Sequence, residues 1–181
     1  MVELETIAIA HVMLRDGREV TVRPLEFSDR AAMLAFGRAL PPDDRLYIPD
    51  DFESPDVINR LVSAHSADHW RQIVAVAGDM IVGYGAIQQQ PGWSSHVAEL
   101  QLVVSSGWRR SGLGSFLAPL LLDGAREMGA SKAIVEMIEE QVSGRAIFER
   151  IGFRVEARLA NHARDRCGCS HSLVILASQI G

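Results

Sequence analysis

Apolar residues recur along the chain with two spacings, and each spacing predicts a type of element. Blocks in which every second residue is apolar, or in which a short apolar run lies between turn residues, predict β-strands. The predicted strands cover residues 11–14, 20–23, 70–77, 80–89, 97–104, 132–137, 153–159 and 172–177. Asp16 and Gly17 lie between the first two blocks, and an Asp-Gly pair in this position is typical of a hairpin turn.

Apolar residues at intervals of three and four predict helices over residues 29–40, 55–64, 112–128 and 144–151. Ser28 is expected to cap the first helix. Pro119 lies inside the third and should kink or offset it, because proline lacks a backbone donor. Since strands and helices alternate in the middle of the chain, we expect an α/β or α+β sheet with at least one parallel crossover.

Length and composition are those of a single soluble domain. The chain has 181 residues, of which 48% are hydrophobic and 23% charged, and we expect one domain over residues 1–181, with 1–11 as an N-terminal extension. The net charge of −5 argues against a nucleic-acid-binding protein. There are two cysteines, no basic signal peptide and no apolar run near the roughly 20 residues of a membrane helix. These features predict a cytoplasmic protein without a membrane partner.

The segment RRSGLG, residues 109–114, lies between a predicted strand and a predicted helix and has the composition of an anion site. The first N–H groups of a helix have no partner inside it, and the helix dipole adds positive charge at the same end. Gly112 and Gly114 allow close approach to the backbone, and Arg109 and Arg110 add charged donors. The segment therefore favours a phosphate group, although a glycine-rich surface loop has the same form.

Two common phosphate loops are excluded by the spacing of the glycines. The pattern GxxxxGK[ST] of nucleoside-triphosphate loops is absent, and so is the GxGxxG of dinucleotide-binding folds. The segment also follows a strand in mid-chain, whereas a dinucleotide loop follows the first strand of its fold. The remaining pattern is RxxGxG after a buried strand.

The longer stretch VVSSGWRRSGLG, residues 103–114, resembles the acyl-CoA pyrophosphate signature of the GNAT acyltransferase superfamily, V-x-x-x-x-[QR]-x-x-G-x-[GA]. Val104, Arg109, Gly112 and Gly114 occupy its four defining positions. A glycine-rich turn alone would be weak evidence, but this signature also fixes a valine and an arginine at set distances. The match therefore points to one kind of phosphate, the pyrophosphate of coenzyme A.

Three further segments resemble other parts of the same family, in the same order. LRDGREVTVRPLEFSD at 14–29 is similar to the opening hairpin of bacterial proteins related to the Pat-type protein-lysine acetyltransferases. AELQLVV at 98–104 resembles their central strand, and AIFERIGF at 146–153 resembles a short helix that ends in Gly-Phe. The resemblance thus extends over residues 12–178.

The resemblance implies a fold and a donor, acetyl-CoA. The implied fold is a mixed, mostly antiparallel sheet of roughly six or seven strands with about four helices. Its two central parallel strands, 97–104 and 132–137, would splay apart around the pantetheine arm. The N–H groups of the loop would bind the pyrophosphate. The residues implied in cofactor binding are Leu102, Val103, Val104, Arg109, Arg110, Ser111, Gly112, Leu113, Gly114, Ser115, Gln141 and Phe148.

The implied reaction is direct attack of a primary amine, either a protein lysine or a small amine, on the thioester of acetyl-CoA. Glu99 is the candidate general base, because it stands ten residues before Arg109, as the catalytic-type glutamate does in Pat-like relatives. A carboxylate inside an apolar strand is costly without a partner or a task, and burial raises its pKa toward the range that a base needs. The alternative is a Glu99 that faces outward or forms a salt bridge.

Two positions depart from the family pattern. Phe148 stands where many relatives carry a tyrosine near the leaving sulfur, and Gln141 stands where an asparagine often contacts the cofactor. Water can protonate the departing thiolate. The thiolate leaves readily, because the pKa of a thiol is about 8.5. Phe148 keeps a second function open, that of an acyl-CoA-binding sensor or interaction module with little catalysis. A homodimer is a habit of the family.

Acidic residues from the end of the first predicted helix to the start of the second lie where the resemblance implies that the first two helices cover the acceptor. They are Asp43, Asp44, Asp50, Asp51, Glu53 and Asp56. The segment is either a solvated acidic loop or a surface that attracts a cationic acceptor, with Tyr47 and Phe52 lining the same entrance. Near the C-terminus, Cys167 and Cys169 lie close in sequence to His162 and His171, but the spacing matches no strong zinc motif, so no metal is expected.

Overall fold

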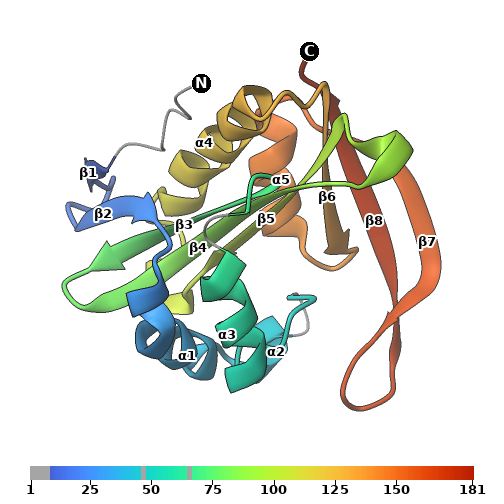
Figure 1. Cartoon of the computed structure of the whole chain (residues 1–181). Coiled ribbons are helices and arrows are strands. Elements are labelled where there is room, and N and C mark those ends of the chain that lie inside the picture. The colour runs from blue at the N-terminus through green and yellow to red at the C-terminus, as the bar shows by residue number, and fades with distance from the viewer. Residues whose placement is uncertain (1–8, 46–47, 65–66) are drawn as a thin grey trace.

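The computed structural model describes residues 9–45, 48–64 and 67–181, and its centre is one twisted sheet (Figure 1). The sheet has eight strands in the order β1-β2-β3-β4-β5-β6-β8-β7. Their bounds are β1 Ala10–Met13, β2 Glu19–Pro24, β3 Trp70–Ala77, β4 Met80–Gln89, β5 Val97–Val104, β6 Lys132–Ile138, β7 Arg154–Arg164 and β8 Ser170–Gln179. Every neighbouring pair is antiparallel except β5 and β6. The mixed, mostly antiparallel sheet expected from the sequence is confirmed: its eight strands correspond to the eight predicted segments and exceed the roughly six or seven that the family resemblance implies.

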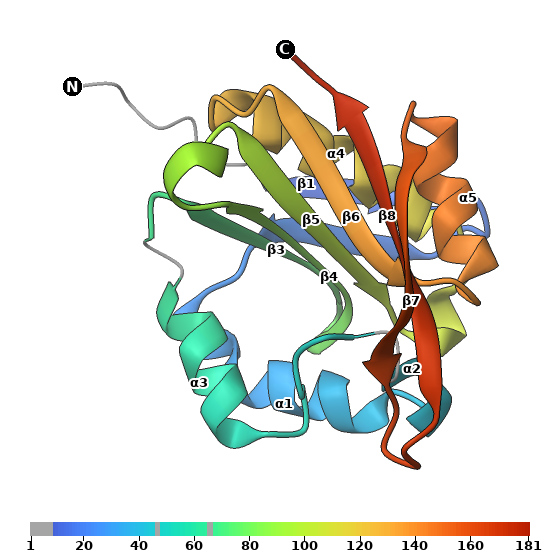
Figure 2. The same ribbon diagram turned by 90° about the vertical axis from the view of Figure 1, so that its right-hand side faces the viewer.

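Helices cover both faces of the sheet (Figure 2). One face packs against α4 Leu113–Glu127 and α5 Val142–Arg150, and the other packs against α1 Arg30–Ala39 and α3 Pro55–Ser63. The very short α2, Pro42–Arg45, lies between α1 and α3 in the chain. None of the described helices is long and apolar enough to cross a membrane.

The apolar spacing that predicts a helix over residues 112–128 corresponds to the buried face of α4. Leu113, Leu117 and Leu121 of α4 are at most 1% exposed and pack on the sheet. α4 continues through Pro119 from Leu113 to Glu127 without interruption. Gly129 follows its end with a φ of +84°, the left-handed conformation that glycine adopts most readily.

The expected cap of the first helix is wrong. Ser28 lies in a 3-10 turn, exposed, and its hydroxyl donates to Glu26. α1 begins two residues later, and Asp29, directly before it, is 6% exposed. The Asp29 carboxylate accepts hydrogen bonds from Arg23 at 2.7 and 2.8 Å and from the Glu26 N–H at 2.8 Å. A buried carboxylate with this many donors fixes the turn more firmly than a serine cap does.

The last two strands are longer than the sequence pattern predicted. β7 and β8 form a hairpin through Arg164 and Ser170, around Gly168 with a φ of +85°. The extra residues are mostly polar and exposed, so they show no alternation of apolar and polar positions from which a strand could be predicted. Pairing across the hairpin, not burial, extends the strands there. The N-terminal extension expected over residues 1–11 lies mostly outside the described residues, and Ala10 and His11 already belong to β1.

The two parallel strands separate at the centre of the sheet. β5 and β6 pair only at Val97 with Lys132, Ala98 with Ala133 and Glu99 with Ile134. β5 stays paired with β4 as far as Val104. Beyond Glu99, the β6-facing edge of β5 therefore has no ladder partner among the described residues. This opening positions the candidate site.

Candidate functional site

The free edge of β5 leads to a loop in which five backbone N–H groups have no protein acceptor among the described residues. Among the described residues, no hydrogen bond forms from the N–H groups of Arg110, Ser111, Gly112, Gly114 and Ser115. Gly114 and Ser115 belong to the first turn of α4, where N–H groups lack intrahelical partners. The loop therefore offers a row of donors at the positive end of a fifteen-residue helix, which is an anion-binding arrangement.

The backbone of this loop is held in an uncommon conformation. Gly112 has a φ of +92° and Arg110 a φ of +58°, and a positive φ costs energy for a residue with a side chain. Ser111 is fully buried and holds the turn together: its hydroxyl donates to Trp108 O at 2.6 Å and accepts from the Leu113 N–H at 3.3 Å. Its carbonyl accepts from the Arg15 N–H at 3.0 Å. The donors are thus preorganised by the loop itself.

Two of the residues predicted to bind the cofactor use their N–H groups inside the protein. Leu113 donates to Ser111, and its side chain is buried in the core beneath α4. The Arg109 N–H donates to Ser106 O at 3.3 Å, and the Arg109 guanidinium forms an ion pair with Asp44 at 2.7 Å. The contact with Asp44 has no signal in the sequence, because it joins residues sixty-five positions apart.

Glu99 lies on β5 where the parallel pairing ends, and it faces away from α4. Its neighbours Ala98 and Leu100 belong to the core beneath α4, and side chains alternate along a strand. The side chain is half-buried and receives a hydrogen bond from Gln90. Burial raises the pKa of the Glu99 carboxyl above its ordinary value, and the nearby carboxylate of Glu136 raises it further. The alternative of a salt-bridged Glu99 is not seen among the described residues.

Glu136 was not singled out by the sequence. Glu99 pairs with Ile134, and Glu136 is two residues further along β6, so its side chain lies on the same face of the sheet, at the opening. It is exposed, and among the described residues it forms no ion pair. Only the register of β5 against β6 places it near Glu99, and register cannot be read from strands that separate after three pairs.

The two positions that depart from the family pattern are both engaged inside the protein. The Gln141 side chain accepts the Ile138 N–H at 3.2 Å directly before α5. The Phe148 ring is 3% exposed and meets the Phe153 ring edge to face at 5.3 Å. Tyr84 supplies no alternative hydroxyl, because it is fully buried, donates to Gln72 at 2.8 Å, and burial keeps its pKa far above the ordinary value.

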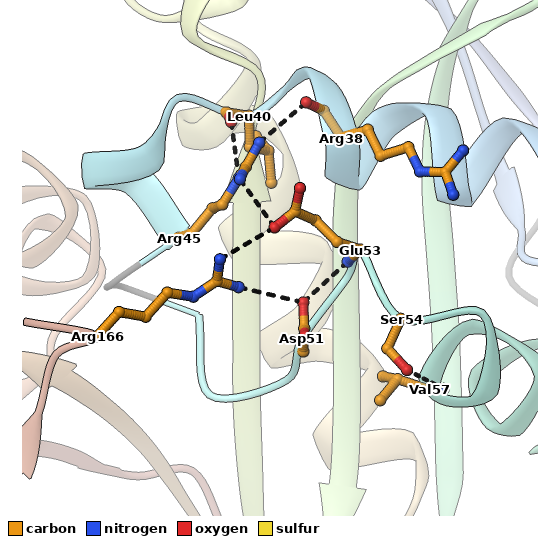
Figure 3. A network of polar contacts seen from close by, with 8 residues as sticks. All are labelled: Arg38, Leu40, Arg45, Asp51, Glu53, Ser54, Val57 and Arg166. Atoms are coloured by element: carbon orange, nitrogen blue, oxygen red, sulfur yellow. Dashed lines mark hydrogen bonds and ion pairs between the residues drawn. The ribbon is translucent and has the colours of Figure 1, made fainter.

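The acidic segment is largely paired with arginines and lines a small pocket, and Figure 3 shows the contacts of Asp51 and Glu53 with Arg45 and Arg166. Asp50 pairs with Arg60 at 2.7 Å, and Glu53 pairs with Arg45 at 2.8 Å and with Arg166 at 3.2 Å. The pocket, of about 220 Å³, is lined by Gly37, Leu40, Arg45, Ile48, Pro49, Asp50, Asp51, Phe52, Glu53 and Arg166. Arg166 comes from the turn of the β7–β8 hairpin, which therefore reaches across to this segment (Figure 2).

Of the two aromatic residues expected at this entrance, Tyr47 lies outside the described residues. Phe52 is 4% exposed and packs against Phe36 and Tyr84 at 6.4 and 5.3 Å between ring centres. It therefore belongs mainly to the core. Asp50 of this pocket acts on Glu99 only through its charge, which adds to the causes that raise the Glu99 pKa.

The cysteines do not form a metal cluster in the described part of the chain. Cys167 and Cys169 are exposed free thiols in the β7–β8 turn. His171 lies between Asp165 and Glu140, each at 3.1 Å, and these two carboxylates raise its pKa above the ordinary value. No group of three or more His, Cys, Asp or Glu side chains is arranged to hold a metal ion in residues 9–45, 48–64 and 67–181.

Comparison with known families identifies the arrangement. Residues 37–153 match the model of the acetyltransferase (GNAT) family, so the match includes the pocket segment, the opening between β5 and β6, the loop and α5. The chain belongs to the GNAT acetyltransferase family. It is an acyltransferase, and acetyl-CoA is its co-substrate.

Solved structures of low sequence identity share the fold. The GNAT domain of PAT from S. lividans is 19% identical with a TM-score of 0.79, and the match covers 94% of this chain and 96% of that one. A ribosomal-protein-alanine N-acetyltransferase from Brucella melitensis is 22% identical, with a TM-score of 0.77 and coverage of 87% and 98%. A protein from Salmonella typhimurium, whose structure contains its cofactor acetyl-CoA, is 18% identical, with a TM-score of 0.76 and coverage of 90% and 94%.

The residues of this chain fit an extended thioester with a pyrophosphate. The unpaired edge of β5 offers backbone groups to the amides of a pantetheine arm, and the loop offers five N–H groups to a pyrophosphate. At Gly114, an added Cβ would come within 2.9 Å of Ile147 of α5, so glycine also permits the close approach of α5 to the loop.

Proposed function

We propose that this acetyltransferase transfers the acetyl group to a primary amine by direct attack, with Glu99 as the general base. The observation that carries the proposal is the half-buried carboxylate of Glu99 at the opening between β5 and β6, without a basic partner among the described residues. A carboxylate in this position is unfavourable for stability, so a catalytic task explains it better than a structural one.

The base must remove a proton from an ammonium group before the amine can attack. An ordinary carboxylate is too weak a base to do this well near neutral pH, and a raised pKa narrows the gap. Burial and Glu136 both raise the pKa of Glu99. The Gln90 hydrogen bond acts in the opposite direction and fixes the orientation of the carboxylate. Acetyl-CoA supplies an activated thioester, so no covalent enzyme intermediate is needed.

For the cofactor, we propose that the backbone of Leu102, Val103 and Val104 pairs with the pantetheine arm. The N–H groups without protein partners, which belong to Arg110, Ser111, Gly112, Gly114 and Ser115, would bind the pyrophosphate. Preorganised donors at a helix N-terminus favour a dianionic group of this kind without further rearrangement. Contacts from Gln141 and Phe148 to the cofactor stay predictions. In the protein alone, the Gln141 side chain accepts a hydrogen bond from the Ile138 N–H, and the Phe148 ring packs against Phe153.

For the acceptor, we propose a cationic primary amine, either on a protein lysine or on a small molecule. The support is the negative charge around the opening, where the charges of Glu136 and Asp50 both act on Glu99. A cation that enters this field is stabilised by it. Glu99 and Glu136 have no basic partner among the described residues, whereas Asp50 and Glu53 pair with arginines, so the attraction is strongest at the two glutamates.

The test is release of free CoA thiol from acetyl-CoA in the presence of a panel of diamines, monoamines and lysine peptides. We expect amine-dependent thiol release and a product that carries one acetyl group on nitrogen, detected by mass spectrometry. Neutral alcohols of the same length serve as the control and should give no release above background. Acetyl-CoA binding without release on any amine of the panel would contradict the proposal.

Phe148 favours a second function, that of an acyl-CoA-binding module with little catalysis. The ring lies in the core and has no proton to give to a departing thiolate. The same assay separates the two functions, because a module binds acetyl-CoA in calorimetry with no acceptor-dependent release. Phe148→Tyr should raise the maximal rate if the missing hydroxyl is what limits it.

A further inference from the structure

The arginine of the GNAT signature does not have a free side chain. Arg109 forms an ion pair with Asp44 of α2 at 2.7 Å, and the Asp44 side chain is only 10% exposed. The Asp44 oxygen in this pair accepts no hydrogen bond among the described residues. The guanidinium is therefore the contact that compensates this charge, and its removal would leave a buried carboxylate unpaired, which is strongly unfavourable.

The pyrophosphate has other donors that are free. Five backbone N–H groups of the loop have no partner in the described part of the chain. The side chain of Arg110 is exposed and forms no ion pair with any described residue. The loop therefore carries two adjacent arginines. Arg110 is available to an anion, whereas Arg109 is already paired with Asp44.

α2 connects the loop to the pocket on the acceptor side. It has only four residues, and its last two side chains reach in different directions. Asp44 binds Arg109, whereas Arg45 donates to Leu40 O at 3.0 Å and to Arg38 O at 3.1 Å and pairs with Glu53 at 2.8 Å (Figure 3). Through Glu53 the chain of contacts continues to Arg166 at the hairpin turn.

We propose that the Arg109 side chain is a positioning residue for the acceptor and not a ligand of the pyrophosphate. It holds α2 through Asp44, and α2 holds the wall of the pocket through Arg45 and Glu53. That wall contains Asp50, whose charge acts on the Glu99 carboxylate. The loop backbone and Arg110 bind the pyrophosphate. The inference rests on the proposed function, because it assumes that the acceptor amine enters at Glu99.

The test compares the same substitution at neighbouring positions, Arg109→Gln and Arg110→Gln, together with Asp44→Asn. Acetyl-CoA affinity is measured by calorimetry, and KM and kcat for the best amine by thiol release. Arg109→Gln and Asp44→Asn should each lower the acceptor kcat/KM by about tenfold and change the acetyl-CoA Kd by less than about threefold. Arg110→Gln should weaken acetyl-CoA binding by about tenfold and leave the acceptor KM close to that of the wild type.

Two further variants separate positioning from a general loss of structure. The double variant Asp44→Asn with Arg109→Gln should be no worse than either single variant, because both remove the same contact. Arg109→Lys should restore most of the acceptor kcat/KM, since lysine keeps the charge opposite Asp44. A merely structural role would lower the melting temperature without this recovery.

The result that would overturn the inference is a loss of acetyl-CoA affinity in Arg109→Gln as large as that in Arg110→Gln. The binding measurements need no turnover. If the wild type acetylates no amine, the proposed function fails, while the comparison of the two arginines still shows which side chain binds the cofactor.

Discussion

At the scale of single residues, the site depends on side chains whose charges lack the usual compensation. Glu99 has a hydrogen-bond donor in Gln90 but no basic partner among the described residues, and Glu136 adds a second negative charge on the same face. Such a pair costs stability, and it also makes the Glu99 carboxylate a stronger base. The same interaction therefore opposes folding and favours the proton transfer that we propose for Glu99.

The influence of Glu136 can be measured as a shift in the pH profile. Glu99 must be deprotonated to act as a base, and burial and then Glu136 raise its pKa. Glu136→Gln removes the repulsion, so the pKa of Glu99 falls and the acidic limb of kcat/KM moves to lower pH. Glu139→Gln is the matched control, because Glu139 is exposed, pairs with Arg158 and is not among the causes of the Glu99 shift. An acidic limb that stays in place in Glu136→Gln would contradict this account.

At the scale of elements, the segment after α1 is fitted closely against the helix. Gly37 of α1 lies so near to Phe52 that an added Cβ would be 2.1 Å from the Phe52 carbonyl oxygen. The obstacle is backbone, which cannot rotate away as a side chain does. Gly37 also lines the pocket with Phe52, so this contact fixes the distance between α1 and the proposed acceptor wall.

Gly37→Ala should therefore destabilise the protein by about 1–3 kcal/mol and raise the KM for the amine, because the segment at Phe52 must shift. Gly144→Ala is the matched control: nothing lies within 4 Å of the added Cβ, and alanine favours the helix, so stability should be unchanged or higher by up to about 1 kcal/mol. Thermal unfolding of both variants checks the difference. Equal melting temperatures for Gly37→Ala and the wild type would contradict this expectation, because the segment at Phe52 would then move aside without loss of stability.

At the scale of the whole molecule, the two faces of the sheet carry separate hydrophobic cores and, in the proposed function, separate tasks. α4 packs on one face and brings its N-terminal loop to the end of β5, whereas α1, α3 and the segment between them line the other face, toward which Glu99 points. β5 and β6 pair no further than Glu99, so the edge of β5 that faces β6 is unpaired among the described residues from there to the loop. In the proposed function the donor lies along this edge and the acceptor reaches Glu99 from the other face.

Much of this organisation could be predicted from the sequence where burial sets the pattern. The apolar runs gave β3, β4 and β5 with their observed bounds, and the signature loop lies at the predicted strand-to-helix turn. The polar hairpin of β7 and β8 was underestimated, because its outer residues are exposed and show no alternation.

The parts of the site that the sequence did not predict all depend on distant contacts. Glu136 approaches Glu99 only through strand register, and Arg166 reaches Glu53 across 113 positions. Arg109 belongs to the family signature, and its ion pair with Asp44 is the reason why we propose a different role for its side chain. A motif identifies residues by spacing along the chain, whereas charge pairing depends on spacing through the fold.

The central claim is that Glu99 removes the proton from the acceptor amine, and the most direct measurement is the turnover of Glu99→Gln. Glutamine keeps the size of the side chain and removes the base. We predict a fall in kcat of about 100-fold or more at saturating acetyl-CoA and amine, with an acetyl-CoA Kd equal to that of the wild type. A Glu99→Gln enzyme that turns over at the wild-type rate would contradict the account.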